Sequence, residues 1–204
     1  MFTLSHESRL VDLLEANQQW TKSTSQQHPD LFPTNAKGQQ PHTLFIACSD
    51  SRVNENCLGV LPGEVFSWRS VANICRPNDL STLSTLEFAV NCLKVNKIVL
   101  CGHTDCGGIN TCVSGKLNNL RENNCSHLAD HLQEVENTRL SYREELAVSD
   151  NPARLLSIRH AERQFVHLVT NPTVKSALQE GNLQVHALLY NVDTGLLEKL
   201  TSTE

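Results

Sequence analysis

Metal-binding residue types stand at the ends of two apolar stretches that favour buried strands. Residues 43–47 are followed directly by Cys48, and residues 98–101 are followed by Gly102 and His103. In open α/β sheets, ligands bind outside the carboxyl ends of the strands, so two adjacent ends would bring Cys48 and His103 together. We therefore expect the chain to fold around a largely parallel central sheet.

The rest of the chain alternates short strands with helical stretches, which is typical of an α/β fold whose sheet is flanked by helices. Further strands are expected at residues 65–71 and 184–190, with a short final strand after the turn at residues 193–195. Helices are expected at residues 7–20, 81–94, 127–148, 152–169 and 172–179, and in the stretch that follows Gly108.

The N-terminal helix is separated from the remainder by a polar stretch, residues 21–40, that contains Pro29, Pro33 and Gly38. A helix on such a tether packs either on a neighbouring subunit or on its own domain. We divide the chain into an N-terminal helical arm with its linker, residues 1–37, and an α/β domain, residues 38–204, that contains both of these strand ends.

The two strand ends carry a ligand set that suits zinc. Cys48, His103 and Cys106 supply two thiols and an imidazole, a three-ligand combination found at catalytic zinc, where water or substrate takes the fourth position. A structural site would close with a fourth Cys or His, and neither segment contains one. Gly107 and Gly108 follow Cys106 and let the backbone come close to a ligand.

A carboxylate and a guanidinium stand beside the first ligand. Asp50 and Arg52 are spaced i, i+2 on an extended segment, so their side chains project to the same side. Arg52 can hold Asp50 through a bidentate pair. The pair keeps the carboxylate away from the metal and leaves it able to accept a proton, in a hydrogen bond, from the group in the fourth position. If the pair breaks, Asp50 becomes a competent fourth ligand and closes the site; we expect the open form.

Composition excludes several other classes. The net charge is −5 without a basic cluster, which argues against nucleic acid as a partner. No run of about 18 apolar residues is present, so we expect no membrane span. The first thirty residues lack the apolar run of a signal peptide, and the eight cysteines are therefore expected to be free thiols in a reducing compartment. We expect a cytoplasmic location, with mitochondrial and nuclear locations left open.

The other cysteines and histidines are expected to be ordinary core or surface residues. We expect five of the cysteines to be small buried side chains without a functional role: Cys75, Cys92, Cys101, Cys112 and Cys125. The histidines outside the motif are His6, His28, His42, His127, His131, His160, His167 and His186. Cys57 lies close to the first motif, so a functional role is less easily excluded for it than for the other five.

The joint pattern resembles the β-class carbonic anhydrases, and most closely their fungal members. The resemblance rests on residues 48–53 and 87–107, and on residues 54–59, which match the fungal form. Further similarity at residues 61–66, 71–73 and 188–192 extends it over roughly residues 38–200. The resemblance implies the fold of that family and reversible hydration of carbon dioxide to bicarbonate and a proton.

The resemblance also implies roles for the motif residues. One zinc ion per chain would be held by Cys48, His103 and Cys106, with hydroxide in the fourth position and anionic inhibitors able to replace it. Asp50 and Arg52 would form the dyad that orients the hydroxide. Because two thiolates cancel the charge of Zn²⁺, this metal should acidify its water less than a site of three imidazoles would.

By the same resemblance, the substrate pocket lies at a dimer interface. Its residues would be Gln39, Phe66, Val71, Phe88, Gly107 and Gly108. Gln39 and Phe88 would serve the zinc of the neighbouring subunit in a homodimer or a dimer of dimers. Bacterial members with an allosteric bicarbonate site pair an Arg and a Tyr with a Trp. Arg69 and Tyr190 match here, but Phe45 replaces the Trp, so we expect no such site.

Two rival functions remain open. A hydrolase of carbon disulfide or carbonyl sulfide could use the same zinc scaffold. The sequence distinguishes such a hydrolase poorly from a carbonic anhydrase. A non-catalytic zinc or thiol redox protein should show a fourth ligand or a Cys-x-x-Cys motif, and neither is present. Carbonate dehydratase activity is therefore the leading hypothesis.

Overall fold

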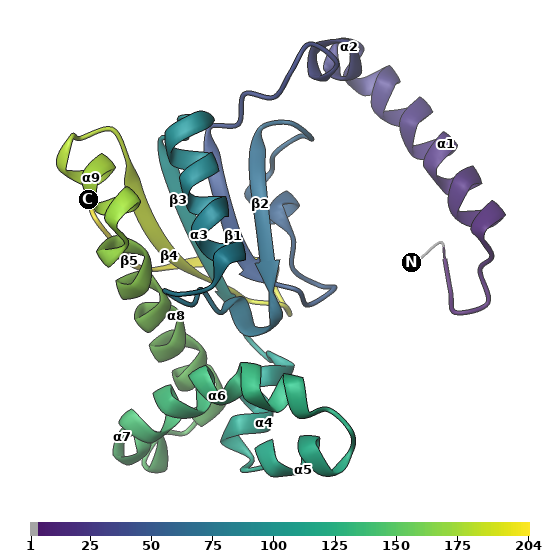
Figure 1. Ribbon diagram of the computed structural model, residues 1–204. Coiled ribbons are helices and arrows are strands. Elements are labelled where there is room, and N and C mark those ends of the chain that lie inside the picture. Colours follow the sequence, from purple (N-terminus) through teal and green to yellow (C-terminus); the bar gives the residue numbers. More distant parts are fainter. Residues whose placement is uncertain (1–3) are drawn as a thin grey trace. The chain divides into compact units, whose positions relative to one another are not determined.

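The computed structural model describes residues 4–204, which fall into two compact units that join between Gln40 and Pro41 (Figure 1). The first unit contains helix α1, Leu10–Gln27, and the short helix α2, Leu31–Asn35. The ring of Trp20 in α1 meets the ring of Phe32 in α2 edge-on, with their centroids 5.6 Å apart.

Helix α1 differs from the prediction at both ends. It begins at Leu10 instead of residue 7, and it continues past Trp20 through a stretch that we had assigned to the linker. Residues 21–27 are polar but contain neither Pro nor Gly, so nothing in them stops a helix; Pro29 follows soon after its end. No residue of α1 or α2 is buried.

The second unit is built on a five-stranded sheet in the order β2-β1-β3-β4-β5. Its strands are β1 (Thr43–Cys48), β2 (Val65–Ser70), β3 (Lys97–His103), β4 (Gln184–Tyr190) and β5 (Leu197–Ser202). All neighbouring pairs are parallel except β4 and β5, which are antiparallel. The predicted α/β fold with a largely parallel sheet is therefore confirmed.

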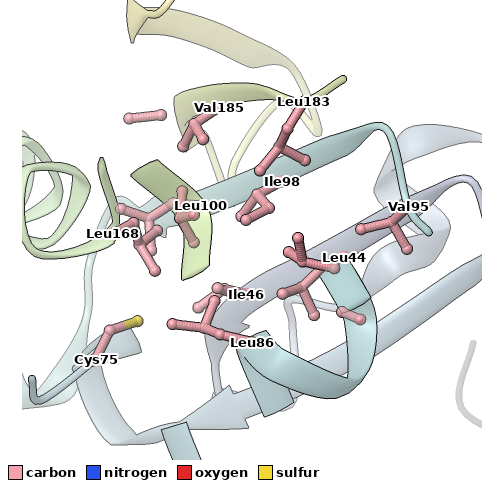
Figure 2. Packing of buried hydrophobic residues seen from close by; sticks show 14 residues of the cluster. Leu44, Ile46, Cys75, Leu86, Val95, Ile98, Leu100, Leu168, Leu183 and Val185 are labelled. Atoms are coloured by element: carbon pink, nitrogen blue, oxygen red, sulfur yellow. The ribbon is translucent and has the colours of Figure 1, made fainter. Parts of the chain in front are cut away.

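Side chains of the central strands alternate between two packed layers. On one face, Leu44 and Ile46 of β1 and Ile98 of β3 pack with Leu86 and Leu168 from the covering helices (Figure 2). On the other face, the side chains of β1 and β3 form a separate buried cluster with the segment that follows β1: Phe45, Ala47, Val53, Val99 and Cys101. Both faces of the central strands are therefore packed.

The covering helices agree with the sequence in position more closely than in length. They are α3 (Leu80–Glu87), α4 (Gly107–Val113), α5 (Leu117–Glu122), α6 (Ser126–Ser141), α7 (Arg143–Ala147), α8 (Pro152–Thr170) and α9 (Pro172–Gln179). Asp79 caps α3 through a hydrogen bond from the backbone N–H of Thr82, and Pro152 and Pro172 begin their helices as expected.

The structure differs from the sequence predictions in several of these segments. Residues 127–148 form two helices instead of one, because the backbone leaves the helical conformation at Tyr142. The predicted helix at residues 81–94 is present, but its last part is a π-helix, Phe88–Cys92. The short helix α5 was not predicted. Cys92 and Cys125 were expected to be buried, and that prediction was wrong because both are exposed.

Within residues 4–204, the structure contains no helix that is both long enough and apolar enough to cross a membrane.

The strand order places a topological switch point between β1 and β3. The chain leaves β1 to form β2 on one side and later returns to form β3 on the other side. Because the connections then run in opposite directions, the carboxyl ends of β1 and β3 border a crevice where ligands bind in open α/β sheets. Cys48 is the last residue of β1, and His103 is the last residue of β3.

Candidate metal centre

Three potential metal ligands meet at these strand ends. The ligand atoms of Cys48, His103 and Cys106 all lie within 4.8 Å of one another. The three residues are 4%, 1% and 3% exposed, respectively. Among residues 4–204, no further Cys, His, Asp or Glu joins this group. The set predicted from the sequence is thus brought together at one point.

Local backbone geometry explains how Cys106 reaches the other two ligands. Asp105 takes the left-handed conformation, with φ of 55°, and so turns the chain sharply after β3. Asp adopts this conformation more readily than most residues do. Cys106 then serves as the N-cap of α4, and its sulfur lies within 4.8 Å of that of Cys48 at the end of β1.

The imidazole of His103 is oriented for metal binding. Its Nδ1 lies 2.9 Å from the carbonyl oxygen of Thr104, and because a carbonyl only accepts, Nδ1 is the protonated nitrogen. The other nitrogen, Nε2, is buried and has no hydrogen-bond partner among the described residues. A neutral imidazole fixed by a backbone carbonyl is the usual arrangement of a metal-ligating histidine.

The Cys48 sulfur lies in a polar environment that favours thiolate. Its Sγ accepts hydrogen bonds from the backbone N–H groups of Asp50, at 3.4 Å, and Ala72, at 3.3 Å. The pKa of the Cys48 thiol is lowered to about 4, chiefly by a hydrogen bond with the Cys106 thiol and also by His103, although burial acts in the opposite direction.

The pKa of the Cys106 thiol shifts in the opposite direction. Sharing a proton with Cys48, together with burial, raises the pKa of Cys106, while the backbone N–H groups of Ile109 and Gly108 act to lower it. The pair therefore yields one thiolate easily and the second when a cation displaces the shared proton. Two such sulfurs and a neutral imidazole fit zinc.

Arg52 and Asp50 are paired as the sequence predicts. Arg52 donates from Nε to Oδ1 of Asp50 at 2.9 Å and from Nη2 to Oδ2 at 2.8 Å, which is a bidentate pair. It also donates from Nη1 to Oδ2 of Asp105 at 2.9 Å. The Arg52 guanidinium holds the pKa of the Asp50 carboxyl well below its usual range. Oδ2 of Asp50 lies 4.0 Å from Nε2 of His103, beside the candidate metal position.

A second arginine holds the segment that carries this dyad. Arg69, on β2, donates from Nε to the carbonyl oxygen of Cys48 at 2.9 Å. Its Nη2 donates to the carbonyl oxygen of Asp50 at 2.6 Å and to that of Val53. This role of Arg69 could not be predicted from the sequence, where the residue matches only an allosteric site, because backbone acceptors leave no pattern in the sequence.

The proposed pocket residues are distributed unevenly around this centre. Val71 directly follows β2, at the end of the strand where Ser70 pairs with Cys48. Phe66 pairs with a residue near the other end of β1, and its ring contacts that of Phe88 with centroids 5.6 Å apart. Gln39 is an exposed residue of the first unit.

The two glycines after Cys106 differ in how tightly they are packed. A Cβ added at Gly108 would lie 2.8 Å from Cδ2 of Leu132 and 3.2 Å from Cβ of Ala72, whereas one added at Gly107 would have nothing within 4 Å. Gly108 therefore allows α4 to approach the metal centre and the core residue Leu132 closely.

This difference predicts opposite results for two alanine variants. We expect Gly108→Ala to lower the free energy of unfolding by about 1–3 kcal/mol, because the buried neighbours must shift. The matched variant Gly107→Ala should leave it unchanged or slightly raised, since Ala favours a helix. Urea unfolding of both variants measures this, and equal stabilities would contradict the packing argument.

The comparisons with known proteins agree on one family. A family model described as carbonic anhydrase matches residues 43–197. A carbonic anhydrase of Saccharomyces cerevisiae is 52% identical over 209 aligned positions, and the alignment covers 99% of this chain and 93% of that protein. A tetrameric β-carbonic anhydrase of Sordaria macrospora is 35% identical with a TM-score of 0.85, covering 94% of this chain and 97% of that one. A Coccomyxa β-carbonic anhydrase in complex with acetazolamide is 29% identical with a TM-score of 0.87, covering 96% and 88%.

Proposed function

Since the chain belongs to the β-carbonic anhydrase family and is a carbonate dehydratase, we propose that it works through one zinc ion held by Cys48, His103 and Cys106. The reaction is the reversible hydration of carbon dioxide to bicarbonate and a proton. The observation that carries the proposal is the buried Nε2 of His103, which has no hydrogen-bond partner among residues 4–204 and belongs to a residue whose ligand atom lies within 4.8 Å of both sulfurs.

When bound, zinc supplies Lewis acidity, which brings the pKa of water from roughly 15.7 to about 7. Two thiolate ligands weaken this effect because they neutralise the cation. The backbone N–H groups on the sulfurs counteract the weakening, since each hydrogen bond withdraws charge from a sulfur: Asp50 and Ala72 donate to Cys48, and Gly108 and Ile109 donate to Cys106.

Asp50 and Arg52 orient the reacting water in this proposal. The carboxylate of Asp50 can only accept hydrogen bonds, because its depressed pKa keeps it ionised. It accepts the proton of the attacking group in a hydrogen bond and so directs a lone pair at carbon dioxide. The bidentate pair with Arg52 supports the open form, because it holds both carboxylate oxygens.

The rate of carbon dioxide hydration is expected to increase with pH. Hydration of carbon dioxide should rise between about pH 6 and pH 9, because the attacking group forms by loss of a proton from water. Asp50 does not cause the rise, since its pKa lies below the usual value of 3.8 and it is ionised throughout. Stopped-flow rates in both directions measure this: dehydration of bicarbonate should fall as hydration rises, and a flat hydration profile would contradict it.

We also propose that the site is completed by assembly. The exposed Phe88 and Val71 and the edge strand β2 support a homodimer or a dimer of dimers in which Gln39 and Phe88 serve the pocket of a neighbouring subunit, with Phe66 in contact with Phe88. The tetrameric Sordaria relative is consistent with this. Anionic inhibitors are expected at the open metal position, and the Coccomyxa complex with acetazolamide makes that compound a suitable probe.

Stopped-flow hydration of carbon dioxide, run together with a measurement of zinc per chain, tests the proposal. Fast hydration with about one zinc per chain would support it. One zinc without hydration would point to a closed site with Asp50 on the metal, or to a sulfur-containing substrate such as carbon disulfide. A purified chain that neither contains nor takes up zinc would refute it.

A further inference from the structure

The Cys48 sulfur accepts one of its hydrogen bonds from a strained turn, η2, Val71–Asn73. Ala72 and Asn73 both take the left-handed conformation, with φ of 56° and 48°. Asn adopts this conformation more readily than most residues do, but Ala does not, so the conformation of Ala72 persists only because the surroundings enforce it. The strain therefore identifies a place where neighbouring side chains must hold the backbone.

Two histidines hold this turn by its carbonyl groups. His131, on α6, lies with Nε2 3.0 Å from the carbonyl oxygen of Val71. His160, on α8, lies with Nε2 3.1 Å from the carbonyl oxygen of Ala72. Because carbonyl oxygens only accept, each Nε2 carries the proton and donates. Consecutive peptide groups of the turn are thus fixed from two different helices.

The first of these peptide groups also reaches the metal centre. The carbonyl of Val71 and the N–H of Ala72 belong to the same planar peptide group. Its oxygen accepts from His131 while its N–H donates to Sγ of Cys48 at 3.3 Å. A hydrogen bond to the oxygen of an amide polarises the group and makes its N–H a stronger donor.

We propose that His131 is a positioning residue for the metal centre, acting through the Val71–Ala72 peptide group on the Cys48 sulfur. This inference rests on the proposed zinc function. His131 holds the N–H of Ala72 on the sulfur and strengthens its hydrogen bond, which withdraws charge from the thiolate and makes the metal more acidic. His160 fixes the next peptide group and so prevents the turn from relaxing.

The helix that carries His131 is itself tied to this part of the chain. Nη2 of Arg76 donates to the carbonyl oxygens of Asp130 and His131, both at 2.9 Å. Leu132 packs in the buried cluster that contains Cys48 and Ala72. The position of His131 relative to the turn is therefore fixed by the contacts of its own carbonyl group and of its two neighbours in the chain, Asp130 and Leu132.

His131 suits the test better than His160, because it is only partly buried whereas His160 is completely buried and its loss could prevent folding. Three variants separate the alternatives. His131→Leu removes the donor, and His131→Gln keeps an N–H near the position of Nε2. His167→Leu is the matched control. His167 donates from α8 to the carbonyl of Cys75, at 3.3 Å, and is not part of the proposed relay, which runs from His131 through the Val71–Ala72 peptide group to Cys48.

The direct measurement is the absorption of the cobalt(II)-substituted proteins. In His131→Leu the thiolate-to-cobalt charge-transfer band should move to lower energy, because the sulfur regains charge. Hydration of carbon dioxide by the zinc form should fall about threefold to tenfold at neutral pH and recover at high pH. His131→Gln should restore both properties, and His167→Leu should change neither.

The outcomes distinguish this inference from the proposed function. If the wild type binds zinc and hydrates carbon dioxide but His131→Leu leaves the band and the pH profile unchanged, the relay is refuted and the function stands. A loss of activity in His131→Leu that is equal at every pH, with an unshifted band, also overturns the relay, since it indicates structural damage only. A wild type without zinc refutes the function itself.

Discussion

Replacing Cys106 by serine is expected to remove zinc and almost all activity. A serine hydroxyl is not ionised near neutral pH and is a much poorer zinc ligand than a thiolate, and the two remaining ligands cannot hold the metal firmly. Hydration of carbon dioxide should fall by roughly three orders of magnitude or more, because water is then no longer acidified. Zinc per chain and stopped-flow rates measure the two effects on the same sample.

Cys112 provides the matched control for this variant. It is completely buried, in the same packed cluster as Cys106, and its thiol donates to the carbonyl oxygen of Leu132 at 3.8 Å. Burial raises the pKa of the Cys112 thiol to about 12, so it is not a thiolate. Cys112→Ser should keep zinc and activity. Equal zinc content in both variants would show that Cys106 is not a ligand.

Replacing Arg52 by alanine is expected to abolish activity while zinc stays bound. Without the bidentate pair, the carboxylate of Asp50 is free to turn toward the metal position beside it and take the fourth coordination site. The rate of hydration should fall by about 100-fold or more, since neither an oriented proton acceptor nor an open position remains. Full activity in Arg52→Ala with zinc present would rule out the proposed role of the dyad.

Two further variants separate closure of the site from loss of the guanidinium alone. In the double variant Asp50→Ala with Arg52→Ala, no carboxylate remains to close the site, so binding of an anion such as azide should return although fast hydration does not. Arg52→Lys should fall between wild type and Arg52→Ala, because an ammonium cannot form the bidentate pair. Absorption of the cobalt-substituted proteins during anion titration measures access to the metal.

The sequence predicted those features that depend on local pattern. Strand β4 has the predicted bounds, and Pro172 begins α9 where its ring suits the first turn. Cys48 and His103 could be placed together because both stand at strand ends and such ends share one edge of a parallel sheet. The dyad followed from the i, i+2 spacing of Asp50 and Arg52.

The remaining features depend on contacts between distant segments. The break at Tyr142 divides a stretch whose periodicity alone predicts one helix. His131 bonds a carbonyl that lies 60 positions away, and Arg69 bonds one that lies 21 positions away. Their acceptors are backbone carbonyls, which every residue has, so no residue type marks the partner. His131 was consequently expected to be an ordinary histidine.

The hydrogen bonds that Arg69 donates to three backbone carbonyls order the site before the substrate binds. They fix the carbonyl oxygens of Cys48, Asp50 and Val53, so the conformational entropy of this loop is lost once, when the protein folds. Carbon dioxide has only three atoms and no charge, and a ligand so small can supply little binding free energy to order a flexible site. An enzyme for such a substrate cannot rely on induced fit, and the ordering must already be present in the polypeptide.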